Sequence, residues 1–158
     1  MSAESDLGHL RRCLDLASEA LDFGAEPFGS ALVDAHGVVR HEDRNRTAGG
    51  DQTRHPEFEL ARWSTKHMSF AERASATVYT SGEHCPMCAA AHGWVGLGPI
   101  VYAGSTEQLT RWQAELQVPA GPVAPLPINE IVPNMTVRGP FPEFAEELRE
   151  LHRRSLLG

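Results

Sequence analysis

Residues 81–88 read Ser81-Gly82-Glu83-His84-Cys85-Pro86-Met87-Cys88, and the interpretation of the whole chain starts from this stretch. Cys85 and Cys88 lie three positions apart at the start of an apolar segment, so a helix that begins here places both sulfurs on one side of its first turn. Backbone N–H groups and the positive end of the helix dipole favour the thiolate form at that position. Such a pair suits a soft divalent metal, most often zinc.

Two thiolates are half of a metal site, and the best candidate for a third ligand is His55, which Glu57 follows two residues later. Structural zinc sites usually have four protein ligands, whereas catalytic sites keep one position for water. Three ligands and a nearby carboxylate therefore favour a catalytic site. The alternative is a zinc knot in a binding domain, which needs a fourth ligand. His84 and His92 are the candidates, but His92 is interpreted as a packed histidine and His84 as a surface or supporting one.

An H-x-E motif followed by C-x-x-C is typical of zinc deaminases. The sequence resembles the cytidine-deaminase-like superfamily, and within it the guanine deaminase and tRNA adenosine deaminase branch. The resemblance extends from about Pro27 to Tyr102 and departs from the usual pattern at Pro56 and at His84. It rests on four motifs in order, which are Glu26-Pro27-Phe28-Gly29, Asn45, His55-Pro56-Glu57 and Glu83-His84-Cys85-Pro86-Met87-Cys88.

The resemblance implies hydrolytic deamination with a Zn²⁺ cofactor held by His55, Cys85 and Cys88. Bound zinc lowers the pKa of water from about 15.7 to roughly 7. Glu57 is expected to remain unbound to zinc and to carry protons from this water to a ring nitrogen and to the leaving ammonia.

The resemblance also implies substrate contacts for three residues outside the metal motif. Asn45 would hold the substrate ring or ribose, although Asn is also an ordinary turn residue. Phe28 and Trp94 would stack on a flat ring, although aromatic residues in a strand and a helix are more often core residues.

Three polar residues are weaker candidates for substrate binding. Glu83 could accept N–H groups of a guanine-like ring, or it could be a solvated charge or an anion at a helix start. His84 could touch the substrate. Glu143 could bind an amino group if its segment reaches the site, although a glutamate in a Glu-rich helix is usually solvated.

Hydrophobic periodicity and turn residues predict an α/β fold with three layers, α/β/α, around a five-stranded mixed sheet. A strand–helix–strand order around Cys85 predicts a parallel right-handed crossover. We interpret residues 1–158 as one domain, with 118–158 a Pro-rich arm and C-terminal helix. The predicted helices are 6–23, 55–68, 86–97, 105–116 and from about 142, and the predicted strands are 28–33, 38–41, 77–80, 100–103 and 136–138.

Composition limits the partners and the compartment. The chain has 41% hydrophobic and 22% charged residues, as expected of a soluble globular protein, and lacks a long apolar run. An odd cysteine count predicts a reducing, cytoplasmic environment, with Cys13 a buried spectator. The net charge of −7 argues against nucleic acid as a partner. Guanine deaminases of this fold are dimers that exchange C-terminal segments, so the resemblance implies a homodimer.

The first hypothesis is therefore a zinc-dependent deaminase of a free aminated heterocyclic base, either guanine or a related purine or s-triazine. The alternatives are a cytidine-type nucleoside deaminase, a tRNA adenosine deaminase, which the acidic charge disfavours, and a zinc-stabilised binding domain without catalysis.

Overall fold

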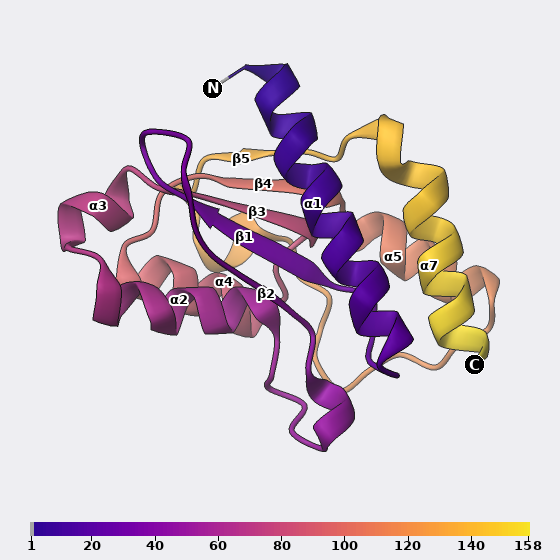
Figure 1. The fold of residues 1–158 in the computed structure, drawn as a ribbon. Helices are drawn as coiled ribbons and strands as arrows, with labels where there is room; N and C mark the ends of the chain where they lie inside the picture. The colour runs from indigo at the N-terminus through magenta and orange to yellow at the C-terminus, as the bar shows by residue number, and fades with distance from the viewer. Residues whose placement is uncertain (1) are drawn as a thin grey trace.

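The computed structural model describes residues 2–158, which form one five-stranded sheet with helices on both faces (Figure 1). The strand order is β2-β1-β3-β4-β5, in which β1 pairs antiparallel with β2 and β3, and β4 pairs parallel with β3 and β5. The predicted α/β class with a five-stranded mixed sheet is confirmed. The strands are β1 (Gly29–Val33), β2 (Val39–Arg44), β3 (Thr77–Gly82), β4 (Ile100–Gly104) and β5 (Val137–Arg138).

The helices follow the predicted order with two additions. These are α3, whose Ser69 and Glu72 form a capping box, and α6, a single turn within the Pro-rich arm. No helix was predicted within the Pro-rich arm, so α6 is a correction to the predicted set of helices. The α-helices are α1 (Ala3–Asp22), α2 (Pro56–His67), α3 (Phe70–Ala74), α4 (Pro86–Val95), α5 (Thr106–Glu115), α6 (Ile128–Ile131) and α7 (Ala145–Leu157), and the 3₁₀ helices are η1 (Thr47–Gly49) and η2 (Pro142–Phe144).

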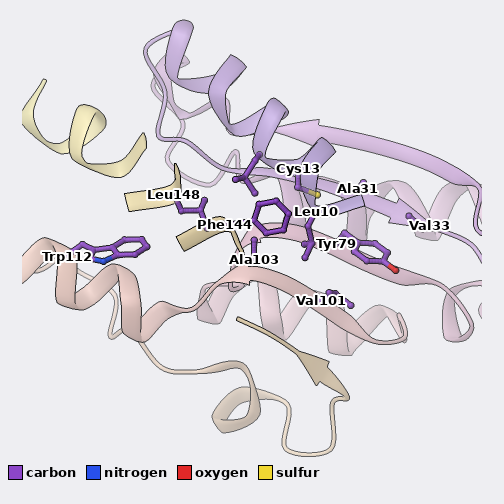
Figure 2. Close-up of a cluster of buried hydrophobic side chains, with 11 residues drawn as sticks. Leu10, Cys13, Ala31, Val33, Tyr79, Val101, Ala103, Trp112, Phe144 and Leu148 are labelled. Carbon is purple, nitrogen blue, oxygen red and sulfur yellow. The ribbon is translucent and has the colours of Figure 1, made fainter. Parts of the chain in front are cut away.

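One face of the sheet packs against α1, α5 and the C-terminal helix. Alternate residues of each strand point to this face, as the two-residue period of a strand requires. Figure 2 shows the resulting apolar cluster, and Cys13 is fully buried in it, which confirms its interpretation as a spectator. The cluster comprises Leu10, Cys13, Leu14, Ala31, Val33, Tyr79, Val101, Ala103, Trp112, Phe144 and Leu148.

The opposite face packs against α2 and α4, and the candidate site is built on this side. Leu32 of β1 and Val78 of β3 join the apolar cluster here with Leu60 of α2. Ser30 and Thr80 have the same parity as Leu32 and Val78, and they are directly paired across β1 and β3. Both side chains therefore point toward α2 rather than toward α1.

The C-terminal segment returns to its own domain within the single chain. Arg138 of β5 donates to the buried carboxylate of Asp6 in α1 at 3.0 and 3.1 Å, and the Tyr79 hydroxyl donates to the same carboxylate at 2.7 Å. Arg11 of α1 donates to Glu147 of α7 at 2.8 Å. These contacts fix the last strand and helix on α1. None of the helices within residues 2–158 is both long and apolar enough to span a membrane.

Candidate active site

Two helix starts meet at the metal motif, and each start carries a proline. His55 is the N-cap of α2 and Cys85 is the N-cap of α4, with Pro56 and Pro86 at the first helical positions. Proline is well tolerated there because the first N–H has no partner within the helix. Residue Cys88 follows on the first turn of α4. The convergence predicted for His55 and the cysteines is therefore present.

The three predicted ligands are brought together closely enough to hold one metal ion. The Nδ1 atom of His55 lies 3.5 Å from the sulfur of Cys85 and 3.6 Å from that of Cys88. All three ligand atoms lie within 4.8 Å of one another. No other cluster of three or more His, Cys, Asp or Glu within residues 2–158 has such a geometry. Two sulfurs and one imidazole nitrogen are a donor set that zinc prefers, so these residues fit the ion.

The charge state of the cysteines also fits metal binding. Hydrogen bonding from Cys88 and from His55 lowers the pKa of Cys85 to about 4. The pKa of Cys88 is raised, because its thiol donates to Cys85 and because it is buried. The pKa of His55 is raised, first by its contact with Cys85. The cluster thus holds a thiolate ready for a cation, and a second thiol next to it.

Glu57 lies on the first turn of α2 and is only 6% exposed. Burial raises the pKa of its carboxyl group to about 7, an effect that the nearby His55 opposes. A group with a pKa near neutrality can both accept and release a proton at physiological pH. The predicted proton carrier therefore has suitable acidity as well as the predicted position.

The carboxylate of Glu57 is held from the sheet by Ser30. The Ser30 hydroxyl lies 3.2 Å from Oε1 of Glu57 and 2.9 Å from Oγ1 of Thr80. The Thr80 hydroxyl in turn donates to the carbonyl of Gly82 at 2.9 Å. Ser30 has one proton for two acceptors, so it donates to Glu57 when that carboxylate is ionised and is free to donate to Thr80 when Glu57 is protonated. The sheet thereby supports both protonation states.

Asn45 stabilises a turn through its side-chain oxygen, while no hydrogen bond of its side-chain N–H₂ group is present within residues 2–158. Asn45 is 1% exposed, and its Oδ1 atom accepts from the N–H and the hydroxyl of Thr47 at 2.9 and 2.7 Å. The loop ends are joined by the Arg46 N–H, which donates to the carbonyl of Arg54 at 3.0 Å, immediately before His55. The turn interpretation of Asn45 is confirmed. Its contact with substrate stays a prediction that involves the remaining amide N–H₂ group.

A cavity of about 460 Å³ opens beside Cys85, within the range of small-molecule sites. It is lined by Glu26, by Glu83, by the start of α4, by α5 and by part of the Pro-rich arm, namely Ala120, Gly121, Val123, Ala124 and Pro125. A larger cavity of about 830 Å³ lies between α5, α6 and Pro140, but its lining includes no metal ligand. The cavity beside Cys85 is therefore the candidate substrate pocket.

Glu83 is engaged by the backbone. Its carboxylate accepts the N–H of Thr106 at 3.0 Å and the N–H of Ile128 at 2.9 Å, which are the first residues of α5 and α6. This confirms the interpretation of Glu83 as a helix-start anion, because N-terminal N–H groups have no partner within their own helix. To bind a substrate as well, the Glu83 carboxylate oxygens would have to accept further hydrogen bonds beside those from Thr106 and Ile128.

The interpretation of His84 as a surface residue is wrong, whereas its interpretation as a supporting residue stays a prediction. His84 is 0% exposed, and its ring meets that of His92 edge-on, with 5.3 Å between ring centroids. Neither ring nitrogen of His84 has a hydrogen-bond partner within residues 2–158. Its full burial also argues against substrate contact. His92 donates from Nε2 to the Gly98 carbonyl at 2.7 Å, so it is a packed histidine as predicted. Neither ring joins the metal cluster.

The predicted aromatic contacts and Glu143 do not line the pocket. Phe28 is half-buried and packs 5.1 Å from the ring of His152, which favours its core interpretation. Trp94 is 88% exposed near the end of α4, so neither the core nor the pocket prediction describes it. Glu143 is exposed in η2, and it is absent from the lining of the cavity beside Cys85. Neither Trp94 nor Glu143 is among the residues that line this cavity, so their contact with substrate stays a prediction.

Comparison with known proteins identifies the family. Residues 3–104, which include every ligand and Glu57, match the sequence model of the family described as "Cytidine and deoxycytidylate deaminase zinc-binding region". The chain belongs to this deaminase family. Within this zinc-binding region, His55, Cys85 and Cys88 are the residues whose geometry could hold the ion.

Relatives of the deaminase act on different bases. The chain is 35% identical to a probable cytosine deaminase of Schizosaccharomyces pombe over 127 residues, which cover 80% of this chain and 75% of the relative. It is 32% identical to a guanine deaminase of Bacillus subtilis over 95 residues, 60% of this chain and 61% of the relative. The structure of a guanine deaminase from Nitrosomonas europaea shares the fold, with a TM-score of 0.73 at 17% identity, over 100% of this chain and 87% of the other.

Two residues beside the deaminase site were not predicted as functional. Ser30 could have been found from its alternation with Leu32, which places it on the α2 face, but its partner Glu57 depends on how α2 crosses the sheet. Glu26 stands within a motif that carries the resemblance, yet nothing in the sequence shows that the chain turns its side chain into the cavity beside Cys85.

Proposed function

We propose that this protein is a zinc-dependent hydrolytic deaminase of a free aminated heterocyclic base. The observation that carries the proposal is a buried carboxyl group, Glu57, on the helix turn that also supplies His55, beside two cysteines that complete a three-ligand set. A zinc knot would need a fourth protein ligand, and the cluster within residues 2–158 has none. That absence favours catalysis over a purely structural site.

When bound by His55, Cys85 and Cys88, zinc supplies a Lewis acid that makes water a nucleophile at neutral pH. Glu57 takes a proton from the attacking water and delivers it to a ring nitrogen of the substrate. As the new C–O bond forms at the ring carbon, the C=N bond loses its double-bond character. Glu57 then takes the proton of the newly added hydroxyl group and passes it to the exocyclic amine, so that the C–N bond breaks, ammonia leaves and a carbonyl forms.

The surrounding residues hold this carboxylate in place. Ser30 fixes the rotamer of Glu57 from the sheet side, and burial excludes bulk water from the proton path. The pKa of Glu57, about 7, allows the same group to act as base and then as acid. Thr80 supports Ser30 when Glu57 carries the proton.

Guanine or a related purine or s-triazine is the proposed substrate class, and cytosine is a second candidate because of the similarity to a probable cytosine deaminase. A nucleoside deaminase remains the alternative within enzymes. The net charge of −7 argues against a tRNA substrate. Assembly as a homodimer stays part of the proposal, and it would give Glu143 and Trp94 a possible role at a neighbouring site.

Ammonia release from a panel of bases and nucleosides tests the proposal. The panel comprises guanine, isoguanine, cytosine, adenine, ammeline, 5-azacytosine, guanosine, cytidine and adenosine. Turnover of at least one free base supports the proposal, turnover of nucleosides alone moves the assignment to the nucleoside class, and no turnover with tightly bound zinc supports the binding-domain alternative.

A further inference from the structure

Glu26 belongs to a rigid connection between α1 and β1. Ala25 and Pro27 on either side of it are buried, whereas Glu26 itself is exposed. Its carbonyl accepts the N–H of Phe28 at 2.9 Å, and the Phe28 carbonyl accepts the N–H of Asn45 at 2.9 Å. The fixed φ of proline adds to this restraint. The backbone therefore fixes the point on the surface from which the Glu26 side chain extends.

That place is the wall of the cavity beside Cys85. Glu26 lines the cavity together with Cys85, Thr110 and Gln113. Among residues 2–158, no basic side chain forms an ion pair with the Glu26 carboxylate. The Pro-rich arm supplies Ala120, Gly121, Val123, Ala124 and Pro125 to the same lining.

Glu26 differs in this respect from the other carboxylates at the site. Glu83 lines the same cavity, but its two oxygens accept backbone N–H groups of Thr106 and Ile128. Glu57 is bound by Ser30 and is needed for proton transfer. Within residues 2–158, no hydrogen bond to the carboxylate of Glu26 is present. The pocket thus contains one carboxylate that is available to a ligand.

An ionised carboxylate accepts hydrogen bonds and cannot donate them, so it selects ligands that offer N–H groups. Free nucleobases carry ring N–H donors away from the amine that is removed, such as N1–H of cytosine or N9–H of guanine. In a nucleoside that nitrogen is substituted by the sugar and has no proton. We infer that Glu26 is a specificity-determining residue whose carboxylate accepts a ring N–H of a free base, an inference that rests on the proposed function.

The kinetic test compares Glu26→Ala with wild type on the free base that wild type deaminates best and on its N-methylated derivatives. Glu19→Ala, which removes an exposed negative charge from α1, is the matched control. We expect Glu26→Ala to lower kcat/KM for the free base on the order of 10- to 100-fold, mainly through a higher KM. This factor corresponds to the loss of one charge-assisted hydrogen bond. The derivative methylated at the recognised nitrogen should react equally poorly with both proteins.

Binding without turnover gives a second readout. Calorimetric titration of the same free base into zinc-loaded Glu57→Gln and into the Glu57→Gln/Glu26→Ala double variant should show the same 10- to 100-fold difference in Kd. The inference is wrong if wild type is active and Glu26→Ala has the same kcat/KM for the free base. It is also wrong if Glu26→Ala loses as much kcat/KM on every methylated derivative as on the free base, because Glu26 then does not accept a ring N–H. If wild type deaminates no base, the proposed function fails and the inference fails with it.

Discussion

Glu83→Ala is expected to destabilise the protein rather than to alter substrate binding. The carboxylate accepts two backbone N–H groups, at 3.0 Å from Thr106 and at 2.9 Å from Ile128. Hydrogen bonds to charged groups contribute about 1.5–3 kcal/mol each, so removal of both should lower the free energy of unfolding by about 3–6 kcal/mol. For a chain of this size that corresponds to a fall in Tm of roughly 6–24 °C.

Urea unfolding in excess zinc, followed by circular dichroism, measures this change. Glu83→Gln keeps one carbonyl acceptor and should lose about half as much stability. Glu107→Ala is the matched control, because Glu107 is on the first turn of α5 and is exposed. The loss there should stay under about 1 kcal/mol, the usual value for a charge near a helix end. A Glu83→Ala protein with wild-type stability and a much higher KM would refute the reasoning and restore Glu83 as a substrate contact.

Three further predictions concern catalysis, the metal and pH. Ser30→Ala should lower kcat about tenfold with zinc content unchanged, since it removes the hydrogen bond that positions Glu57, and an unchanged kcat would show that burial alone fixes the carboxylate. Cys88→Ala should lose stoichiometric zinc in elemental analysis, and zinc retained at the wild-type level would contradict the ligand assignment. Burial lowers the pKa of His152 to about 4 from 6.5, so the unfolded chain binds a proton that the folded chain does not. Stability should therefore fall by up to about 3 kcal/mol between pH 6.5 and 4, and the fall should be smaller in His152→Leu, whereas equal slopes in urea unfolding at several pH values would contradict this.

The grouping of His55 with Cys85 and Cys88, and the place of Glu57 beside them, could be predicted from the sequence because they depend on local structure. A proline directly after His55 and another after Cys85 place each ligand at a helix start, and Glu57 follows from the same turn. These relations depend on spacing within a few residues, and the sequence displays them directly.

Residues whose role depends on tertiary contacts were harder to place. The Ser69-x-x-Glu72 capping box was present as a signal for α3, but α6 begins where Glu83 accepts its first N–H, 45 positions away in sequence. The burial of His84 arises from packing against His92, and the exposure of Trp94 arises from its place near the end of α4. Neither follows from hydrophobic periodicity.

The pocket lining was likewise out of reach of sequence patterns. Glu26 is brought to Cys85 by the turn between α1 and β1, and the Pro-rich arm closes the same cavity from a distant part of the chain. Phe28 occurs in a motif of the family, yet here its ring packs against His152 of α7. The resemblance therefore located the reacting groups better than the groups that surround a substrate.

The most direct test of the account is turnover and zinc content of Glu57→Gln beside wild type, on the best free base of the panel. The account predicts unchanged zinc content and a loss of ammonia release of at least about 100-fold, as expected when a general acid–base group is removed. A Glu57→Gln protein that releases ammonia at the wild-type rate would contradict it.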